Sequence, residues 1–464
     1  MKKFVALWVV LALMIALCSG CGTTKDAGSR KLNLSEAVSL TICGPWTASK
    51  AFEAASQAFY EKYPNCEIIY EYVQNYEKSL VNRLENTPES VDLFLSTNAQ
   101  VDSPYFPYAE ELFAHQELNL ADTNKALIKN FTLKNPDPEA AAEIYAIPLG
   151  GELRGMYVNK TLLASLGLAV PTTKDEFFAA CQVIKEAGYV PMNGNPGMFA
   201  QRTLYPYVCN LVANADNYQA LYDKVARCDV GVSELFRQPM QFMYTAVAQD
   251  YYNYKYVETE LHMFTDNSDE GCARYFFNIL DEGAGFAKKD DVGTVAFMSG
   301  TLTQQTTMDK VKDDYHSEID YAFVMAPVSD EGGFAYISPA QGLAVNRKSA
   351  HLDWAIEFMN YLFSKAGNTR FAQDSNYIPN TTDSFAVIHE KFDIPENHIS
   401  DLGQMTFQYD FYSVITNALM NVSKGNNPKY MDTDANGNPV LYPFEHYMDE
   451  LEAAFAAQRE SEVR

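Results

Sequence analysis

The stretch LTICGPWTASKAFEAASQAFYEKYPNCEIIYEYV, residues 40–73, decides the fold class of this chain. Residues 40–43 are apolar and β-prone, and the Gly-Pro pair after them ends the strand. A helix is expected next, because apolar residues recur every three or four positions until a Pro-Asn pair stops the pattern. Residues 67–73 then form a second strand. The stretch therefore predicts a strand–helix–strand unit.

The pattern continues for one more helix and one more strand. Residues 76–84 predict a helix, and residues 91–95, VDLFL, predict a third strand. Strands that alternate with helices form a parallel sheet through right-handed crossovers, and ligands bind beyond the carboxyl ends of such strands. One of these ends carries Trp46, and another carries residues 96–98. Trp46 is therefore expected at the mouth of the sheet, with a core position as the alternative.

A second group of elements begins at residues 144–160, IYAIPLGGELRGMYVNK. It predicts a strand, a Pro-Leu-Gly-Gly break, another strand and a helix that begins at Asn159. Residues 173–187 predict an amphipathic helix, whose inward side chains are Phe177, Ala180, Cys181 and Ile184. Further along, the sequence predicts the end of a helix at 297–300, strands at 319–324 and 335–346, and a helix at 353–363 with Trp354 in the core.

The composition favours two or three globular domains. The chain has 464 residues, 47% of them hydrophobic, which is enough for more than one core. Its 60 acidic residues outnumber its 35 basic residues, and the net charge is −25. A field of this sign repels nucleic acid and anionic lipid, so neither is expected as a partner. The 30 Tyr and 28 Phe, together with the carboxylates, favour a carbohydrate ligand, because sugar faces stack on rings while carboxylates accept from hydroxyls.

The N-terminal segment MKKFVALWVVLALMIALCSGCG is typical of an export signal. Two lysines precede an uncharged apolar run that is too short for an ordinary membrane-spanning helix. The residues before Cys21 resemble the bacterial lipobox, in which the cysteine is acylated once residues 1–20 have been removed, although Cys18 stands where Leu is usual. A plain secretory signal is the alternative. We expect a lipid anchor on Cys21 at the outer face of the cell membrane, followed by a flexible tether over residues 21–36.

Six further cysteines have no metal-binding spacing: Cys43, Cys66, Cys181, Cys209, Cys228 and Cys272. No CxxC pair occurs, and six cysteines in so long a chain do not form a disulfide scaffold. Cys43 and Cys66 lie on or beside two strands that are expected to be neighbours, so a bridge between them is one reading. Buried free thiols are the other, and we favour it.

Three motifs fall short of a catalytic or metal-binding assignment. Residues 44–50, GPWTASK, miss a P-loop, because Ser49 replaces the second glycine and Ala51 replaces the Mg²⁺-binding hydroxyl. Residues 432–437, DTDANG, imitate the start of a calcium loop, but its twelfth position is Pro443, and a hairpin around Asn-Gly is the favoured reading. The seven histidines form neither HxxH nor HExxH, and GxSxG is absent. No cofactor and no metal are expected.

Taken in order, these segments resemble the extracellular solute-binding proteins of bacterial ABC importers, the group that includes the maltose-binding proteins. The resemblance covers nearly the whole chain after Cys21. It is carried by the opening stretch, by VDLFLST, by AIPLGGELRGMYVNKTLLASLGLAVPTTKDEFFAACQVIKEAGYVPM (residues 146–192), by VAFMSG, by GLAVNRKSAHLDWAIEFMNYLFS (residues 342–364) and by NYIPN.

The resemblance implies an α/β, periplasmic-binding-protein-like type II fold, in which two lobes joined by crossing hinge strands close on a ligand between them. The first lobe would comprise residues 37–148 and 341–372, and the second lobe residues 154–335 and 376–464. The hinge would comprise residues 149–153 and 336–340, with a third pass at residues 377–379.

The resemblance also implies site residues. Glu152 precedes Asn159 by the interval that separates a sugar-contacting glutamate from an Asn-Lys pair in the maltose-binding group, so it would accept hydrogen bonds from sugar hydroxyls. A solvated hinge acid, or a salt bridge to Arg154, is the alternative. The other candidates for ligand contact are Trp46, Asn98, Gln100, Arg202, Tyr205, Met308, Asp309 and Tyr336. Residues 301–311 lack the cleft aromatic that relatives often show, so a maltose-like stacking platform is not expected there.

We therefore expect a lipid-anchored, monomeric receptor that captures a carbohydrate and presents it to an ABC transporter permease without breaking a bond. A binding protein for another solute, such as a polyamine or glycerol phosphate, is one alternative. A secreted glycosidase, which needs two carboxylates across a cleft, is a second. An interaction module that feeds a sensor kinase is a third.

Overall fold

The computed structural model describes most of the chain. The described residues are 32–96, 101–133, 140–194, 199, 202, 204–214, 216, 218–227, 229, 231–252, 269–279, 293–401, 417–418, 421–422, 424–425, 429 and 431–462. The chain divides into two compact units, Met1–Glu36 and Ala37–Arg464, and the fold below belongs to the second. Within the described part of the chain, no helix combines the length and the apolar character needed to cross a membrane. The expected signal peptide and Cys21 lie outside the described residues.

The first lobe is built on a five-stranded sheet with the order β2-β1-β3-β10-β4. Its strands are β1 (Val38–Gly44), β2 (Cys66–Tyr72), β3 (Leu93–Ser96), β4 (Ile147–Pro148) and β10 (Gly342–Val345). β1 is parallel to β2 and β3, whereas β10 is antiparallel to β3 and β4. The helices of this lobe are α2 (Ser49–Lys62), α3 (Tyr76–Asn86), α4 (Lys125–Phe131), α14 (Leu352–Leu362) and α15 (Lys365–Ser375). The predicted parallel strand–helix–strand unit is confirmed.

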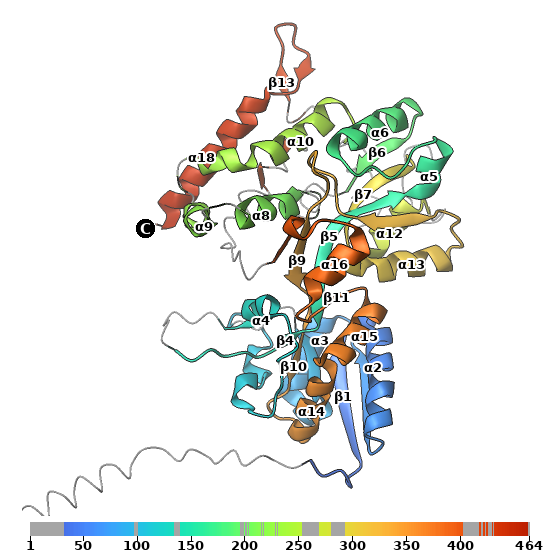
Figure 1. The fold of residues 1–464 in the computed structure, drawn as a ribbon, viewed down its shortest axis with the longest axis vertical. Coiled ribbons are helices and arrows are strands. Elements are labelled where there is room, and N and C mark those ends of the chain that lie inside the picture. The colour runs from blue at the N-terminus through green and yellow to red at the C-terminus, as the bar shows by residue number, and fades with distance from the viewer. Residues whose placement is uncertain are drawn as a thin grey trace, which may run out of the picture. The chain divides into compact units, whose positions relative to one another are not determined.

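Helix α2 forms because its apolar residues fall on one face. Ala51, Phe52, Ala55 and Phe59 are all buried. The ring of Phe52 stacks on Tyr70 of β2 at a centroid distance of 5.0 Å and meets Phe371 of α15 edge-on at 4.9 Å. Helices α2 and α15 accordingly pack side by side (Figure 1). Trp354 on α14 is 5% exposed, which confirms its place in the core.

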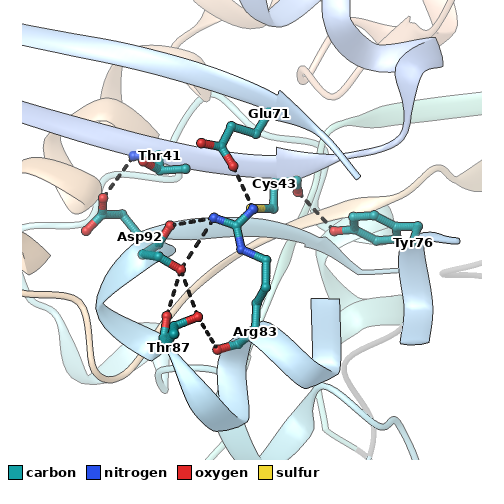
Figure 2. Close-up of polar contacts among 8 residues, drawn as sticks. Thr41, Cys43, Glu71, Tyr76, Arg83, Thr87 and Asp92 are labelled. Atoms are coloured by element: carbon teal, nitrogen blue, oxygen red, sulfur yellow. Dashed lines mark hydrogen bonds and ion pairs between the residues drawn. The ribbon is translucent and has the colours of Figure 1, made fainter. Parts of the chain in front are cut away.

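Tyr76 joins the carboxyl ends of β1 and β3. Its hydroxyl accepts from the Leu95 backbone amide at 2.8 Å. The same hydroxyl lies 2.9 Å from the Cys43 carbonyl, as Figure 2 shows. Beside it, the Arg83 guanidinium of α3 pairs with Glu71 of β2 at 2.6 Å. Burial raises the pKa of Tyr76 well above its ordinary value, so the hydroxyl stays protonated and keeps its donor. The strand ends at the mouth of this sheet are therefore held in a fixed arrangement.

The second lobe is built on a sheet with the order β12-β9-β5-β7-β6, to which β8 and β11 are added through β5. Its strands are β5 (Gly150–Asn159), β6 (Val190–Asn193), β7 (Val295–Thr301), β8 (Tyr321–Val324), β9 (Ala335–Pro339), β11 (Ile378–Pro379) and β12 (Ile399–Asp401). Its helices are α5 (Lys160–Ser165), α6 (Lys174–Glu186), α8 (Tyr205–Ala213), α9 (Tyr218–Ala226), α10 (Arg237–Ala248), α12 (Asp269–Phe276), α13 (Gln305–Asp314), α16 (Ser384–Phe392) and α18 (Phe444–Glu462).

Two predictions for this lobe are confirmed. Helix α5 begins after Asn159, whose side chain accepts a hydrogen bond from the Leu162 amide. Helix α6 buries the four side chains that the sequence placed inward, Phe177, Ala180, Cys181 and Ile184. Because these positions recur every three or four residues, one face of the helix packs on the sheet while the other stays in solvent.

The helix expected to end at residues 297–300 is wrong. These residues belong to β7, which lies between β5 and β6 and is buried along its whole length. A central strand that is covered on both faces needs no alternation of polar and apolar residues, and a short apolar run of this kind does not distinguish a strand from a buried helix. The run VAFMSG is such a case.

Three crossings join the lobes near the centre of Figure 1. The chain passes from β4 to β5 at Leu149, from β9 to β10 at residues 340–341, and from α15 to β11 after Ser375. The stretch 335–346, expected to be one strand, is therefore two strands in two sheets. The fold is α/β with two lobes joined by crossing strands, as the sequence predicts.

All five cysteines among the described residues are free thiols, and four of them are buried. β1 and β2 are neighbours, but the register pairs Cys66 with Val38 and Cys43 with Glu71. Five residues of strand correspond to roughly 16 Å, whereas a disulfide needs Cα atoms within about 7 Å. The reading as free thiols is confirmed, and the Cys43–Cys66 bridge is excluded by register. Cys228 lies outside the described residues.

Burial of these thiols predicts a loss of stability at alkaline pH. Burial raises the pKa of Cys43 to about 11 and that of Cys66 to about 12, from 9.0. The contribution of both groups to the free energy of unfolding is therefore complete below pH 9 and is lost as the pH rises through their raised pKa values. Urea unfolding from pH 8 to pH 11 should show this fall. A Cys43→Ala/Cys66→Ala variant should show a shallower fall, and an unchanged slope would contradict the assignment.

The turn at residues 432–437 is a hairpin, as favoured from the sequence. β13 (Asp432–Thr433) and β14 (Pro439–Val440) pair antiparallel around it. Asp434 Oδ1 accepts from the Asn436 and Asn438 amides, both at 2.8 Å, and these bonds hold the pKa of Asp434 below its ordinary value. The carboxylate that imitates a calcium ligand thus serves the turn.

Candidate ligand-binding cavity

A cavity of about 310 Å³ lies where the crossings meet. Its lining comes from both lobes and from the crossing segments, and consists of Thr47, Glu152, Asp269, Thr303, Thr306, Pro339, Ala340, Gln341, Ser375 and Tyr377. Two larger hollows, of about 730 and 590 Å³, each lie within one lobe. We assign the site to the smaller cavity, because it alone among these three is bounded by both lobes and carries converging polar groups.

Glu152 is the carboxylate that the first crossing brings into the cavity. It lies on β5 opposite Ser338 of β9, and its Oε1 accepts a hydrogen bond from the Thr303 hydroxyl. The side chain is half-buried. Arg154, the alternative partner considered from the sequence, places its guanidinium 5.6 Å from the centroid of the Tyr336 ring. Glu152 therefore faces the cavity with a second oxygen available for a ligand.

A second carboxylate, Asp269, is connected to Arg202 through one amide. Gln304 donates from Nε2 to Asp269, and its Oε1 accepts from Arg202 at 3.1 Å and from the Thr301 amide at 2.9 Å. The amide thus has both of its ends fixed. Since Asp269 begins α12 and Gln304 precedes α13, this network holds two helix starts of the second lobe against the cavity.

The third crossing supplies Ser375 and Tyr377. Asn376 lies between them and caps the end of α15 in the left-handed conformation, with φ of 56°. Its side-chain Nδ2 donates to the Thr306 hydroxyl at 3.0 Å. That bond connects the third crossing to the second lobe at the cavity wall. Burial, and then the neighbouring Glu152 carboxylate, raise the pKa of Tyr377, so its hydroxyl remains a donor.

The lining suits a ligand that is rich in hydroxyl groups. The Thr and Ser hydroxyls donate and accept, the Gln341 amide does both, and the two carboxylates accept. Hydrogen bonds from hydroxyls to carboxylates are the strong members of such a set. Among the described residues, no group of three or more His, Cys, Asp or Glu side chains could hold a metal ion.

The residues predicted from the sequence as ligand contacts fall into three groups: those in or near the cavity lining, those outside the described residues, and those away from the lining. Glu152 lines the cavity, Arg202 is connected through Gln304 to the lining residue Asp269, and Trp46, 40% exposed, precedes the lining residue Thr47. Asn98 and Gln100 lie outside the described residues.

The third group lies away from the cavity lining. Tyr205 and Tyr336 are buried against each other, with ring centroids 5.5 Å apart. Met308 is buried in the second lobe, and Asp309 accepts from the Tyr321 hydroxyl at 2.5 Å. Tyr205, Tyr336 and Met308 pack in the interior of the second lobe, whereas Asp309 lies on the exposed side of α13.

Sequence reasoning missed most of the lining: Thr47, Asp269, Thr303, Thr306, Gln341, Ser375 and Tyr377. Thr303 and Thr306 had a usable signal. They follow the carboxyl end of β7, so the rule that placed ligand after β1 and β3 would have found them had β7 been recognised as a strand. Gln341 and Tyr377 stand within or beside the expected hinge passes. Asp269 had no such signal.

Comparisons with known proteins agree with this architecture. The model of the family described as bacterial extracellular solute-binding protein matches residues 44–369. No curated protein matches the chain.

Solved structures cover almost the whole chain. The GacH receptor of Streptomyces glaucescens, solved unliganded and with acarbose, has a TM-score of 0.58 at 15% identity and covers 91% of this chain and 98% of its own. The cyclic alpha-maltosyl-1,6-maltose binding protein of Arthrobacter globiformis has a TM-score of 0.53 at 16% identity, covering 91% and 99%. A binding protein of an ABC transporter from Bifidobacterium animalis subsp. lactis, in complex with mannobiose, has a TM-score of 0.51 at 16% identity, covering 92% and 96%. These likenesses show a shared fold.

Proposed function

The chain belongs to the family of bacterial extracellular solute-binding proteins, and from that premise we propose that it is a receptor that captures a carbohydrate and delivers it to the permease of an ABC importer. The observation that carries the proposal is the cavity at the crossings, which combines groups from both lobes and is lined by hydroxyls, one amide and two carboxylates. A ligand held by both lobes stabilises their closed arrangement, and this differential affinity is what a permease can read.

The sugar class draws support from the chemistry of the lining and from the relatives. The three solved proteins named above are described with acarbose, cyclic maltosyl-maltose and mannobiose respectively. Among the residues that the structure describes, Tyr377 is the one aromatic residue of this lining, and no Trp belongs to it. We therefore propose that hydrogen bonds to Glu152, Asp269 and the hydroxyls dominate recognition, with little stacking.

The proposed lobes follow the two sheets. The first comprises residues 37–148 and 341–372, the second residues 154–335 and 376–464, and the hinge residues 149–153 and 336–340. The sheets support this division, because β4 and β10 belong to the first sheet and β5, β9 and β11 to the second.

A screen of the chain lacking residues 1–21 against mono- and oligosaccharides tests the proposal. A ligand that binds only the folded state stabilises it by about 2.7 kcal/mol at a hundredfold excess over Kd, so the melting temperature should rise clearly for the true ligand. A hit that stays intact by chromatography supports a receptor. A hit that is cleaved would make the protein a glycosidase with Glu152 and Asp269 as candidate carboxylates, and a hit only with polyamines would replace the sugar.

We further propose that Cys21 carries a lipid anchor that holds the receptor at the outer face of the cell membrane. The export signal and the small residues before Cys21 support it. A Cys21→Ala variant should move from the membrane fraction to the soluble fraction of cells, because the acyl chains would be its means of attachment. A variant that still requires detergent for extraction would contradict the anchor.

A further inference from the structure

Two asparagine side chains bind the chain where the first and third crossings meet. Asn368 is on α15, and Asn380 directly follows β11. Both are completely buried, with 0% exposure, and neither belongs to the cavity lining. A buried amide must find partners for its donors and acceptor, so the bonds of these side chains indicate their purpose.

The two side chains form one continuous set of hydrogen bonds. Asn368 donates from Nδ2 to the Leu149 carbonyl at 2.9 Å and accepts on Oδ1 from the Asn380 amide at 2.6 Å. Asn380 donates from Nδ2 to the Pro148 carbonyl at 2.7 Å and accepts on Oδ1 from the Asn124 amide at 3.1 Å. The first crossing, the third crossing and two segments of the first lobe are thus tied together.

These hydrogen bonds satisfy two backbone carbonyls at the point where the chain leaves the first sheet and enters the second. Pro148 of β4 is paired with Gly342 of β10 in the first sheet. Two residues later, Gly150 of β5 is paired with Pro379 of β11 in the second sheet. The carbonyls of Pro148 and Leu149 stand at this change of sheet, and a buried carbonyl without a donor would destabilise the fold. The asparagine amides supply those donors.

The tied segments carry the cavity residues of the hinge. The Leu149 amide donates to the Gln341 carbonyl at 2.9 Å, and Glu152 follows three residues later. Tyr377 lies between Asn368 and Asn380 in the chain. We propose that Asn368 and Asn380 are positioning residues for ligand binding, which fix the first and third crossings to each other so that Glu152, Gln341 and Tyr377 face the ligand in one arrangement. This rests on the proposed function of the cavity.

Replacing Asn368 with Leu, which branches at the same carbon and has the same number of heavy atoms but no polar atom, tests the proposal in the chain lacking residues 1–21. Calorimetry with the saccharide found by the screen should give a Kd raised about tenfold, because both hydrogen bonds of the Asn368 side chain are lost and the two crossings are no longer held to each other. Hydrogen exchange without ligand should become faster in residues 148–152 and 376–380. Asn368→Ala removes both hydrogen bonds of the side chain without introducing a larger group or a charge, and it provides the same measurements if Asn368→Leu does not fold.

Asn346→Leu is the matched control. Asn346 is 1% exposed and donates to the Pro88 and Val91 carbonyls, both at 2.8 Å, within the first lobe. It should lower the melting temperature while leaving Kd unchanged. Equal losses of affinity in both variants, or wild-type affinity in Asn368→Leu, would overturn the proposal. If the wild type binds no saccharide, the proposed function fails, and hydrogen exchange in Asn368→Leu alone decides. Faster exchange at residues 148–152 and 376–380 than in the wild type supports the positioning role, and unchanged exchange overturns it.

Discussion

Replacing Glu152 with Gln is expected to raise the Kd for the bound saccharide about 10- to 100-fold. The carboxylate already accepts from Thr303 and lines the cavity, so one of its oxygens remains for a ligand hydroxyl. A hydrogen bond to a charged group contributes about 1.5–3 kcal/mol, and each 1.4 kcal/mol is about a tenfold change in Kd. Gln keeps the shape and one acceptor oxygen but removes the charge. Calorimetry would measure the change in Kd.

Asp309→Asn is the matched control for this variant. Like Glu152, Asp309 was predicted from the sequence as a ligand contact, and like Glu152 it accepts a hydrogen bond from a hydroxyl, that of Tyr321 at 2.5 Å. It lies on the exposed side of α13, outside the cavity lining. We expect Asp309→Asn to leave Kd unchanged. Equal Kd values in wild type and Glu152→Gln would exclude a contact between Glu152 and the ligand.

The first lobe could be predicted from the sequence because its signals are local. β1 and β2 are each followed by a helix whose apolar residues are spaced for one face, and Gly, Pro and Asn mark the ends of these elements. The parallel pairing follows from that order alone. The prediction failed at β7, because a strand that is buried on both faces lacks the alternation of polar and apolar residues that identifies strands.

The site was predictable only where sequence spacing reflects its geometry. Glu152 was predicted as a ligand contact from the family resemblance and its interval to Asn159, and the structure places it in the cavity lining, on the strand β5 that leads to α5. Asp269 lines the same cavity and accepts a hydrogen bond from Gln304, which stands 35 residues later in the chain, beyond β7. Such a contact depends on how elements far apart in the chain pack together, and the residues next to Asp269 in the sequence do not indicate it. The buried residues Asn368 and Asn380 were not predicted for the same reason.

Replacing Gly150 with Ala is expected to lower the melting temperature and to weaken ligand binding together. A Cβ at position 150 would stand 2.7 Å from the Tyr377 Cβ and 2.8 Å from the Ile378 carbonyl oxygen. Neither atom is at the end of a flexible side chain, so β11 must move away from β5. Forcing an extra methyl group into packed structure costs about 1–3 kcal/mol. A shift of Tyr377 relative to Glu152 would misalign two walls of the cavity.

Gly188→Ala separates these two effects. Gly188 has φ of +83°, with nothing within 4 Å of a built Cβ, so its substitution strains the backbone by about 1 kcal/mol without displacing a neighbour. Both variants should therefore unfold more easily than the wild type, in thermal melts read by circular dichroism, but only Gly150→Ala should raise Kd. If both bind the saccharide as tightly as the wild type does, the spacing of the first and third crossings does not set the affinity, and ligand recognition must rest on side chains that lie within a single lobe.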